Sequence, residues 1–237
     1  METASRTMRV GVGADALYDE GLRQHMLRVY NFMLMGLGLT GAVALAVASS
    51  PAMMGLIFGT PLQWVVMLAP LGFVFFLSFR ADKISAAKAQ ALFWTFCGAM
   101  GLSLASIFYI YTGASIARVF FIAAAMFGAM SLYGYTTKRD LSKIGSFLIM
   151  GLFGVIIAMI VNLFLQSSAL QFAVSIIGVI VFTGLAAYDT QRIKEVYDEG
   201  HGSEGLAKLA VLGALSLYLS FINLFMMLLS LLGQRDD

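Results

Sequence analysis

The sequence predicts an all-α integral membrane protein whose chain crosses the bilayer seven times. Apolar residues make up 60% of the 237 residues and charged residues only 12%, which is about half the charged share of a soluble domain. The mean hydropathy is +0.87, and the apolar residues fall into runs long enough to cross a bilayer. A helix satisfies its backbone polar groups internally, so spanning helices are the structure that this composition favours.

Seven apolar runs of about 17–25 residues are candidate spans. They lie at 29–48, 62–79, 89–111, 119–135, 144–166, 168–188 and 206–232. The fourth is the shortest. The seventh is long, so its bilayer portion is expected to begin near Val211. The segment 49–60 is also apolar but too short to cross, and we expect it at the membrane interface.

These spans divide the chain into a polar N-terminal tail (1–28), one membrane domain (29–232) and a short C-terminal tail (233–237). The tail has no hydrophobic core or small-residue cleavage site of a signal peptide, so the first span is expected to direct insertion. Glycines within the spans, as at Gly36, Gly38, Gly151 and Gly154, predict close helix packing, because small residues let backbones approach.

The distribution of lysine and arginine predicts a cytoplasmic N-terminus, because cytoplasmic loops carry an excess of both residues. With that orientation only Arg118 and Arg235 lie outside. The inside segments hold the other thirteen: Arg6, Arg9, Arg23, Arg28, Arg80, Lys83, Lys88, Lys138, Arg139, Lys143, Arg192, Lys194 and Lys208. An odd number of crossings then places the C-terminus outside, unless the long seventh segment re-enters.

A labelling experiment tests this topology. Single cysteines placed in the segments 80–88, 136–143 and 189–208, after removal of Cys97, should be protected from a membrane-impermeant reagent added to intact cells. Permeabilised cells provide the positive control for reactivity. Strong labelling of the 136–143 loop in intact cells would show that the predicted number of preceding spans is wrong.

Several function classes find no support in the sequence. Cys97 is the only cysteine and lies in an apolar run, so a disulfide framework and a cysteine metal site are both excluded. His25 and His201 fall in polar segments, and no span offers a metal cluster or a Ser–His pair. There is no phosphate-binding loop and no lysine–arginine run typical of nucleic-acid binding. We therefore expect neither an enzyme nor a bound cofactor.

Asp189 is the one acidic residue that falls within a predicted span; the other twelve acids lie in tails or loops. A carboxylate at the C-terminal end of a helix opposes the macrodipole, and an acid inside the membrane is a functional candidate by default. The alternative is a boundary acid paired with Arg192, which lies one turn later on the same face. Spacing alone does not separate the two interpretations.

The seventh span carries a polar stripe. Ser216, Ser220 and Asn223 are spaced i, i+4 and i+7, so they share one helix face that should point into the bundle. Hydrogen bonding between helices is the simpler explanation of such a stripe, and a pore lining is the functional one.

Three segments together resemble the Bax inhibitor-1, or transmembrane Bax inhibitor motif, family. They are Gly-Leu-Ala-Ala-Tyr-Asp-Thr-Gln-Arg-Ile-Lys at 184–194, Gly-Ala-Leu-Ser-Leu-Tyr-Leu-Ser-Phe-Ile-Asn-Leu-Phe at 213–225, and Ser-Leu-Tyr-Gly-Tyr-Thr-Thr-Lys-Arg-Asp-Leu at 131–141. The third is typical of bacterial members, which suggests a bacterial inner membrane. The resemblance covers nearly the whole chain and implies six helices around a central seventh, with a pH-sensitive calcium leak.

The resemblance also implies an ion and proton site. In the family, an Asp on the sixth span shares a proton with an Asp on the seventh, and a basic residue late in the second span latches onto the pair. The first Asp corresponds to Asp189, and the latch falls near Arg80, with Lys83 as its rival and Arg192 close by. Ser220 occupies the position of the second Asp.

This departure changes what the site is expected to do. Two close carboxylates cannot both ionise easily, so they can share a proton and sense pH. With serine opposite, that repulsion is absent and the hydroxyl can hydrogen-bond the carboxylate. Calcium prefers six to eight oxygen ligands with carboxylates among them, so Asp189 is expected to form only a weak calcium site.

Three functions therefore remain open. The first is a cation leak, calcium by family implication, gated near Asp189. The second is a regulator without transport that binds other membrane proteins, since bacterial members of the family are associated with a membrane-bound AAA protease. The third is a proton-coupled transporter, although no pair of broken helices in matching halves supports it.

Overall fold

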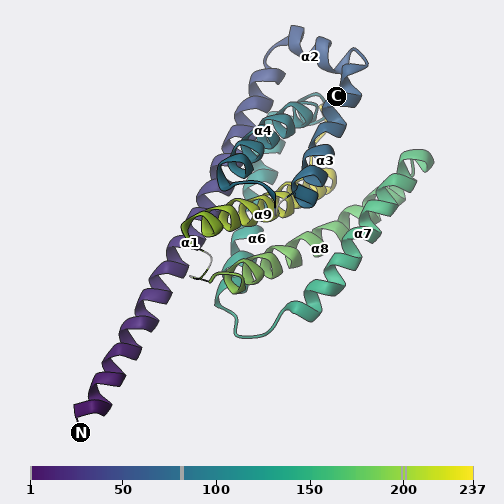
Figure 1. Ribbon diagram of the computed structural model, residues 1–237. Coiled ribbons are helices and arrows are strands. Elements are labelled where there is room, and N and C mark those ends of the chain that lie inside the picture. Colours follow the sequence, from purple (N-terminus) through teal and green to yellow (C-terminus); the bar gives the residue numbers. More distant parts are fainter. Residues whose placement is uncertain (1, 81–82, 199, 201, 237) are drawn as a thin grey trace.

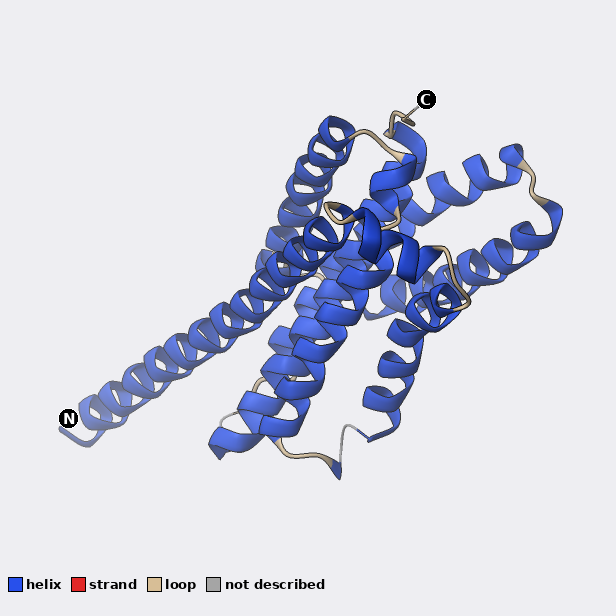
Figure 2. Cartoon of the chain, turned by 90° about the horizontal axis from the view of Figure 1, so that it is seen from above, coloured by secondary structure: helices blue, strands red, loops and turns tan. Residues whose placement is uncertain are grey.

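In a computed structural model of the chain, the backbone is described for residues 2–80, 83–198, 200 and 202–236, and side chains from residue 20 onward except those of 77–80. All regular elements in these ranges are helices (Figure 2), and the prediction of an all-α protein is confirmed. In chain order they are α1 (Glu2–Ala48), α2 (Pro51–Phe58), α3 (Leu62–Arg80), α4 (Ala86–Leu104), α5 (Ile107–Ile110), α6 (Gly113–Thr136), α7 (Ser142–Leu165), α8 (Ser168–Glu195) and α9 (Gly202–Leu232).

Short hydroxyl residues set where four of these helices begin. Ser50, Ser85, Thr112 and Ser167 precede α2, α4, α6 and α8, and each accepts a hydrogen bond from a backbone N–H of the first turn at 3.3–3.4 Å. Each such cap stabilises its helix by about 1 kcal/mol. At the other end of α7, Gln166 adopts the left-handed conformation (φ 49°) that ends a helix.

Within the described residues, six helices are long and apolar enough to cross a membrane, and the number rises to seven if α2 and α3 count as one bent span. The bend between α2 and α3 is 80°, so the apolar segment 49–60 contributes a short helix lying across the end of the bundle (Figure 1). The third predicted span is one helical segment, Ala86–Ile110, in which a turn at Ala105 and Ser106 separates α4 from the single turn α5.

The last helix, α9, is the most enclosed. Tyr218, Leu217, Leu224 and Leu229 on α9 have no exposed surface, and the helix packs against α1, α4, α6 and α8. In contrast, α7 packs mainly on α8, while α3 packs on α4 and α2, so both stand at the edge of the bundle (Figure 1). The arrangement of six helices around a central seventh stays a prediction.

The glycines divide into two groups. A Cβ added at Gly36 would lie 2.8 Å from the Phe93 ring and one at Gly151 3.0 Å from Val181, as close packing requires. Gly38 and Gly154 have nothing within 4 Å of that position, and the packing prediction is wrong for them because they face away from neighbouring helices.

The C-terminal tail is tied to the turn between α5 and α6. Thr112 N donates to Gln234 O at 3.0 Å, Asp236 N donates to Ile110 O at 3.1 Å, and Gln234 N donates to Ser115 Oγ at 2.9 Å. The tail therefore lies at the end of the bundle opposite the N-terminus (Figure 1), as an odd number of crossings requires.

Candidate functional site

The candidate site lies where α8 packs on α9, near the end of the bundle that holds the 137–141 loop and residues 196–198 after α8. We call this the basic end. Asp189 on α8 is buried, with 8% of its surface exposed. Ser220 Oγ on α9 donates a hydrogen bond of 2.8 Å to Asp189 Oδ2. The two residues therefore join the helices through one polar contact inside an apolar interface.

A cavity of about 230 Å³ opens beside the carboxylate. Its lining comes from α8 and α9 and includes Asp189, Arg192, Leu212, Gly213 and Ser216. Ser216 lies one turn before Ser220 and also faces the carboxylate. Asp189 thus contacts two hydroxyl residues of α9, one of which, Ser216, lines the cavity with it.

The other predicted site residues are arranged differently. Arg192 is exposed and lines the cavity, but no ion pair joins the two described side chains of Arg192 and Asp189. Asn223 turns back on its own helix, where its Nδ2 donates to Leu219 O at 2.8 Å. The Arg80 side chain lies outside the described residues, and its rival Lys83 is exposed.

Thr190, directly after Asp189, connects α8 to two further helices. Its hydroxyl lies 3.0 Å from Ser131 Oγ on α6 and 3.4 Å from the Tyr30 hydroxyl on α1. It also donates to Ala186 O at 2.8 Å, one turn back. Thr190 has no exposed surface, so this cluster fixes the position of α8 beside the carboxylate.

Gln191 and Lys194 hold the end of α6 and the loop that follows it. Gln191 Oε1 accepts from Leu141 N and its Nε2 donates to Arg139 O, both at 2.8 Å. Lys194 Nζ donates to Tyr135 O at 3.1 Å and lies 5.4 Å from the centre of that residue's ring. The basic end of α8 is thus bonded to α1, α6, α9 and the 137–141 loop.

Thr190, Gln191 and Lys194 were not among the predicted site residues. Their partners lie 50 or more residues away in the chain, so spacing gives no sign of them. The available signal was the run of polar residues from Asp189 to Lys194 directly after an apolar span.

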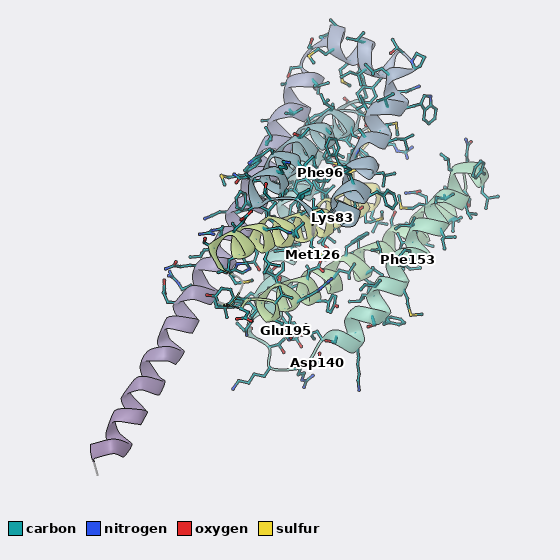
Figure 3. The ribbon with its side chains drawn as sticks, viewed as in Figure 1. Lys83, Phe96, Met126, Asp140, Phe153 and Glu195 are labelled. Carbon is teal, nitrogen blue, oxygen red and sulfur yellow. The ribbon has the colours of Figure 1, made fainter. Side chains whose placement is uncertain are left out.

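The 137–141 loop ends in an exposed acid outside the spans. Asp140 Oδ1 accepts a hydrogen bond of 2.8 Å from Ser142 N, and the bonds from Ser142 lower the pKa of this carboxyl below its usual value. Asp140 and Glu195 are both at the basic end (Figure 3), while Asp189 is enclosed between helices.

The chemistry open to the site follows from its ligands. Among the described residues there is no group of three or more His, Cys, Asp or Glu side chains that could hold a metal ion. One carboxylate and two hydroxyls fall short of the six to eight oxygens that calcium prefers, so backbone or water oxygens would have to complete any calcium shell. A single buried carboxylate can also take up or release one proton on the side that faces the cavity.

Comparison with known proteins places the chain among bacterial membrane proteins. A family model described as "Inhibitor of apoptosis-promoting Bax1" matches residues 22–237. Protein RP147 of Rickettsia prowazekii is 50% identical over 220 residues, which cover 93% of each chain. The inner membrane protein YbhL of Escherichia coli (strain K12) is 49% identical over 218 residues, covering 91% of this chain and 93% of that one.

Proposed function

We propose that this chain, which belongs to the Bax inhibitor family, is a pH-sensitive cation leak with calcium as the permeant ion. It is a multi-pass membrane protein. By analogy with YbhL we place it in the bacterial inner membrane, with the basic end toward the cytoplasm because of the lysine and arginine distribution.

The observation that carries the proposal is the enclosed carboxylate of Asp189 beside a cavity at the basic end. An acid within a membrane span is costly to bury and marks ion or proton pathways. Its negative charge attracts a cation, and the hydroxyls of Ser216 and Ser220 supply neutral oxygens on the same side. A proton on Asp189 removes the charge, which makes the site sensitive to pH.

The closed state would be held at the α8–α9 contact. The Ser220 hydroxyl occupies one carboxylate oxygen, so a cation that takes both oxygens has to displace this hydrogen bond. Arg192 lines the same cavity and is positioned to compete with the cation for the carboxylate. Arg80 remains the latch that the family resemblance proposes.

The direct test is calcium flux into liposomes that contain the pure protein, measured with an enclosed calcium dye at several pH values. The proposal expects flux above that of protein-free vesicles, with a dependence on pH. Absence of flux at every pH would refute the leak.

The alternative function is a regulator without transport that binds other membrane proteins, such as a membrane-bound AAA protease. The observation that favours it is the serine at position 220, because a site with one carboxylate holds calcium weakly. Site-specific crosslinking from the exposed apolar face of α7, at Phe153 or Phe164, to that protease in intact cells would support this function. It would do so most clearly if the liposomes showed no flux.

Ser220→Asp tests whether the serine sets the pH response. The Oγ of Ser220 lies 2.8 Å from Asp189 Oδ2, so an Asp there would form a pair that shares a proton and titrates as a coupled unit. We expect flux to respond more steeply, at a pH nearer neutrality, and calcium to bind more tightly. Asn223→Asp serves as the control for an added charge on α9, because the Asn223 side chain is bonded to Leu219 O of its own helix and not to Asp189. Identical flux curves for the natural protein and Ser220→Asp would show that this contact does not control the leak.

A further inference from the structure

A second hollow lies on the outer surface of the bundle, between α1 and α6. Its volume is about 640 Å³, within the range of small-molecule sites. Most lining side chains are apolar; Leu34, Leu37 and Phe120 lie toward one end and Arg23 and Tyr135 toward the other. Phe221 of α9 closes the floor. We call this hollow the α1–α6 groove.

The groove runs along the direction of the membrane normal. On α1 it extends from Arg23 to Leu37, which is about 21 Å at the helical rise of 1.5 Å per residue. On the antiparallel α6 it extends from Tyr135 to Phe120, a similar length. Half of the bilayer's apolar core is about 15 Å thick, so the groove covers one leaflet from the basic end to the midplane.

The basic end of the groove carries cationic groups. Arg23 lines the groove and is exposed, with Glu20 Oε1 3.2 Å away. Surface pairs of this kind are weak, so a stronger anion can replace Glu20. Lys194 lies against Tyr135, another lining residue, and its ammonium donates only to a backbone oxygen among the contacts described. A phosphate at this level would therefore meet positive charge.

We propose that the α1–α6 groove binds one anionic phospholipid of the leaflet at the basic end. An acyl chain lies along the apolar lining, and the phosphate takes a charge-assisted hydrogen bond from Arg23 in place of Glu20. Lipid binding in the groove does not require ion passage at Asp189, so the proposal holds whether or not the protein conducts ions.

Gly128 provides a variant that fills the groove without disturbing the core. It lines the groove and is exposed, and a Cβ added there meets nothing within 4 Å. Gly154 on α7 is equally exposed and open but lies outside the groove. Gly128→Trp therefore places a large side chain inside the groove. Gly154→Trp places the same side chain on another exposed helix face, outside the groove, and is its control.

The experiment is native mass spectrometry of the full chain in detergent, titrated with phosphatidylglycerol or with phosphatidylcholine of the same acyl chains. We expect one phosphatidylglycerol to bind the natural protein about tenfold more tightly than phosphatidylcholine, as one charge-assisted contact provides. Gly128→Trp should lose both lipids, and Gly154→Trp should keep both. Equal lipid binding by the two Trp variants would overturn the proposal.

Two charge variants test the phosphate end without any change of packing. Arg23→Gln should lose the preference for phosphatidylglycerol but retain acyl-chain binding, while Glu20→Gln should strengthen the preference because it removes the competing carboxylate. Lys143→Gln, an exposed change on α7, is the control for net charge. A preference that survives Arg23→Gln, or that Lys143→Gln abolishes equally, would contradict a headgroup site at Arg23.

Discussion

Replacing Asp189 with Asn is expected to reduce calcium flux by roughly ten- to a hundredfold and to remove its pH dependence, since a contact to a charged group is worth about 1.5–3 kcal/mol. The side chain keeps its shape, and its amide oxygen can still accept the hydrogen bond from Ser220. The variant therefore separates charge from packing. The measurement is dye-reported calcium entry into liposomes between acidic and neutral pH.

Asp140→Asn is the matched control, because it removes one carboxylate from the same end of the bundle at an exposed position outside the spans. Its flux should equal that of the natural protein. If Asp189→Asn also conducts normally at every pH, Asp189 is a boundary acid and the proposed ion site is wrong.

Gly134→Ala should destabilise the protein by about 1–3 kcal/mol, the usual cost of overpacking a well-filled interface. Gly134 lies on α6, where an added Cβ would collide with the backbone oxygen of Ala187 on α8. A backbone atom cannot rotate away as a side chain can, so the two helices would have to separate. Separation would also stretch the bond between Ser131 and Thr190.

Gly128→Ala is the comparison, because Gly128 is on the same helix with nothing near its Cβ position. Alanine favours helix over glycine by about 1 kcal/mol, so this variant should be as stable as the natural protein or more so. Thermal unfolding in detergent, followed by circular dichroism, provides the ranking. A Gly134→Ala protein as stable as Gly128→Ala would show that α6 and α8 do not pack this closely.

The sequence predicted the helical class and the membrane environment well, because both depend on composition and on the length of apolar runs. It also predicted the family, through three motifs. Motif 131–141 and motif 184–194 prove to be neighbours in space: Gly134 contacts Ala187, and Gln191 holds the loop at Arg139. This contact explains why both segments depart from a simple apolar pattern.

Other features could not be predicted, for identifiable physical reasons. The turn at Ala105 and Ser106 has no proline and no charge nearby to signal it. The open positions of Gly38 and Gly154 depend on which helix face meets a neighbour, and a nearly uniform apolar span gives little indication of that face. Ser220 was placed opposite Asp189 by resemblance alone, and their oxygens lie 2.8 Å apart; the role of the pair in ion passage stays a prediction.

The enclosure of α9 has a consequence for how the molecule is made. A ribosome delivers this helix after α1 to α8, yet it supplies the side chains around which α1, α4, α6 and α8 pack. The helices inserted earlier must remain in lipid with their inward faces uncovered until α9 has been synthesised. Assembly of the bundle therefore has to wait for α9, and the backbone bonds that join Gln234 and Asp236 to the turn before α6 can form only after α9 has been made.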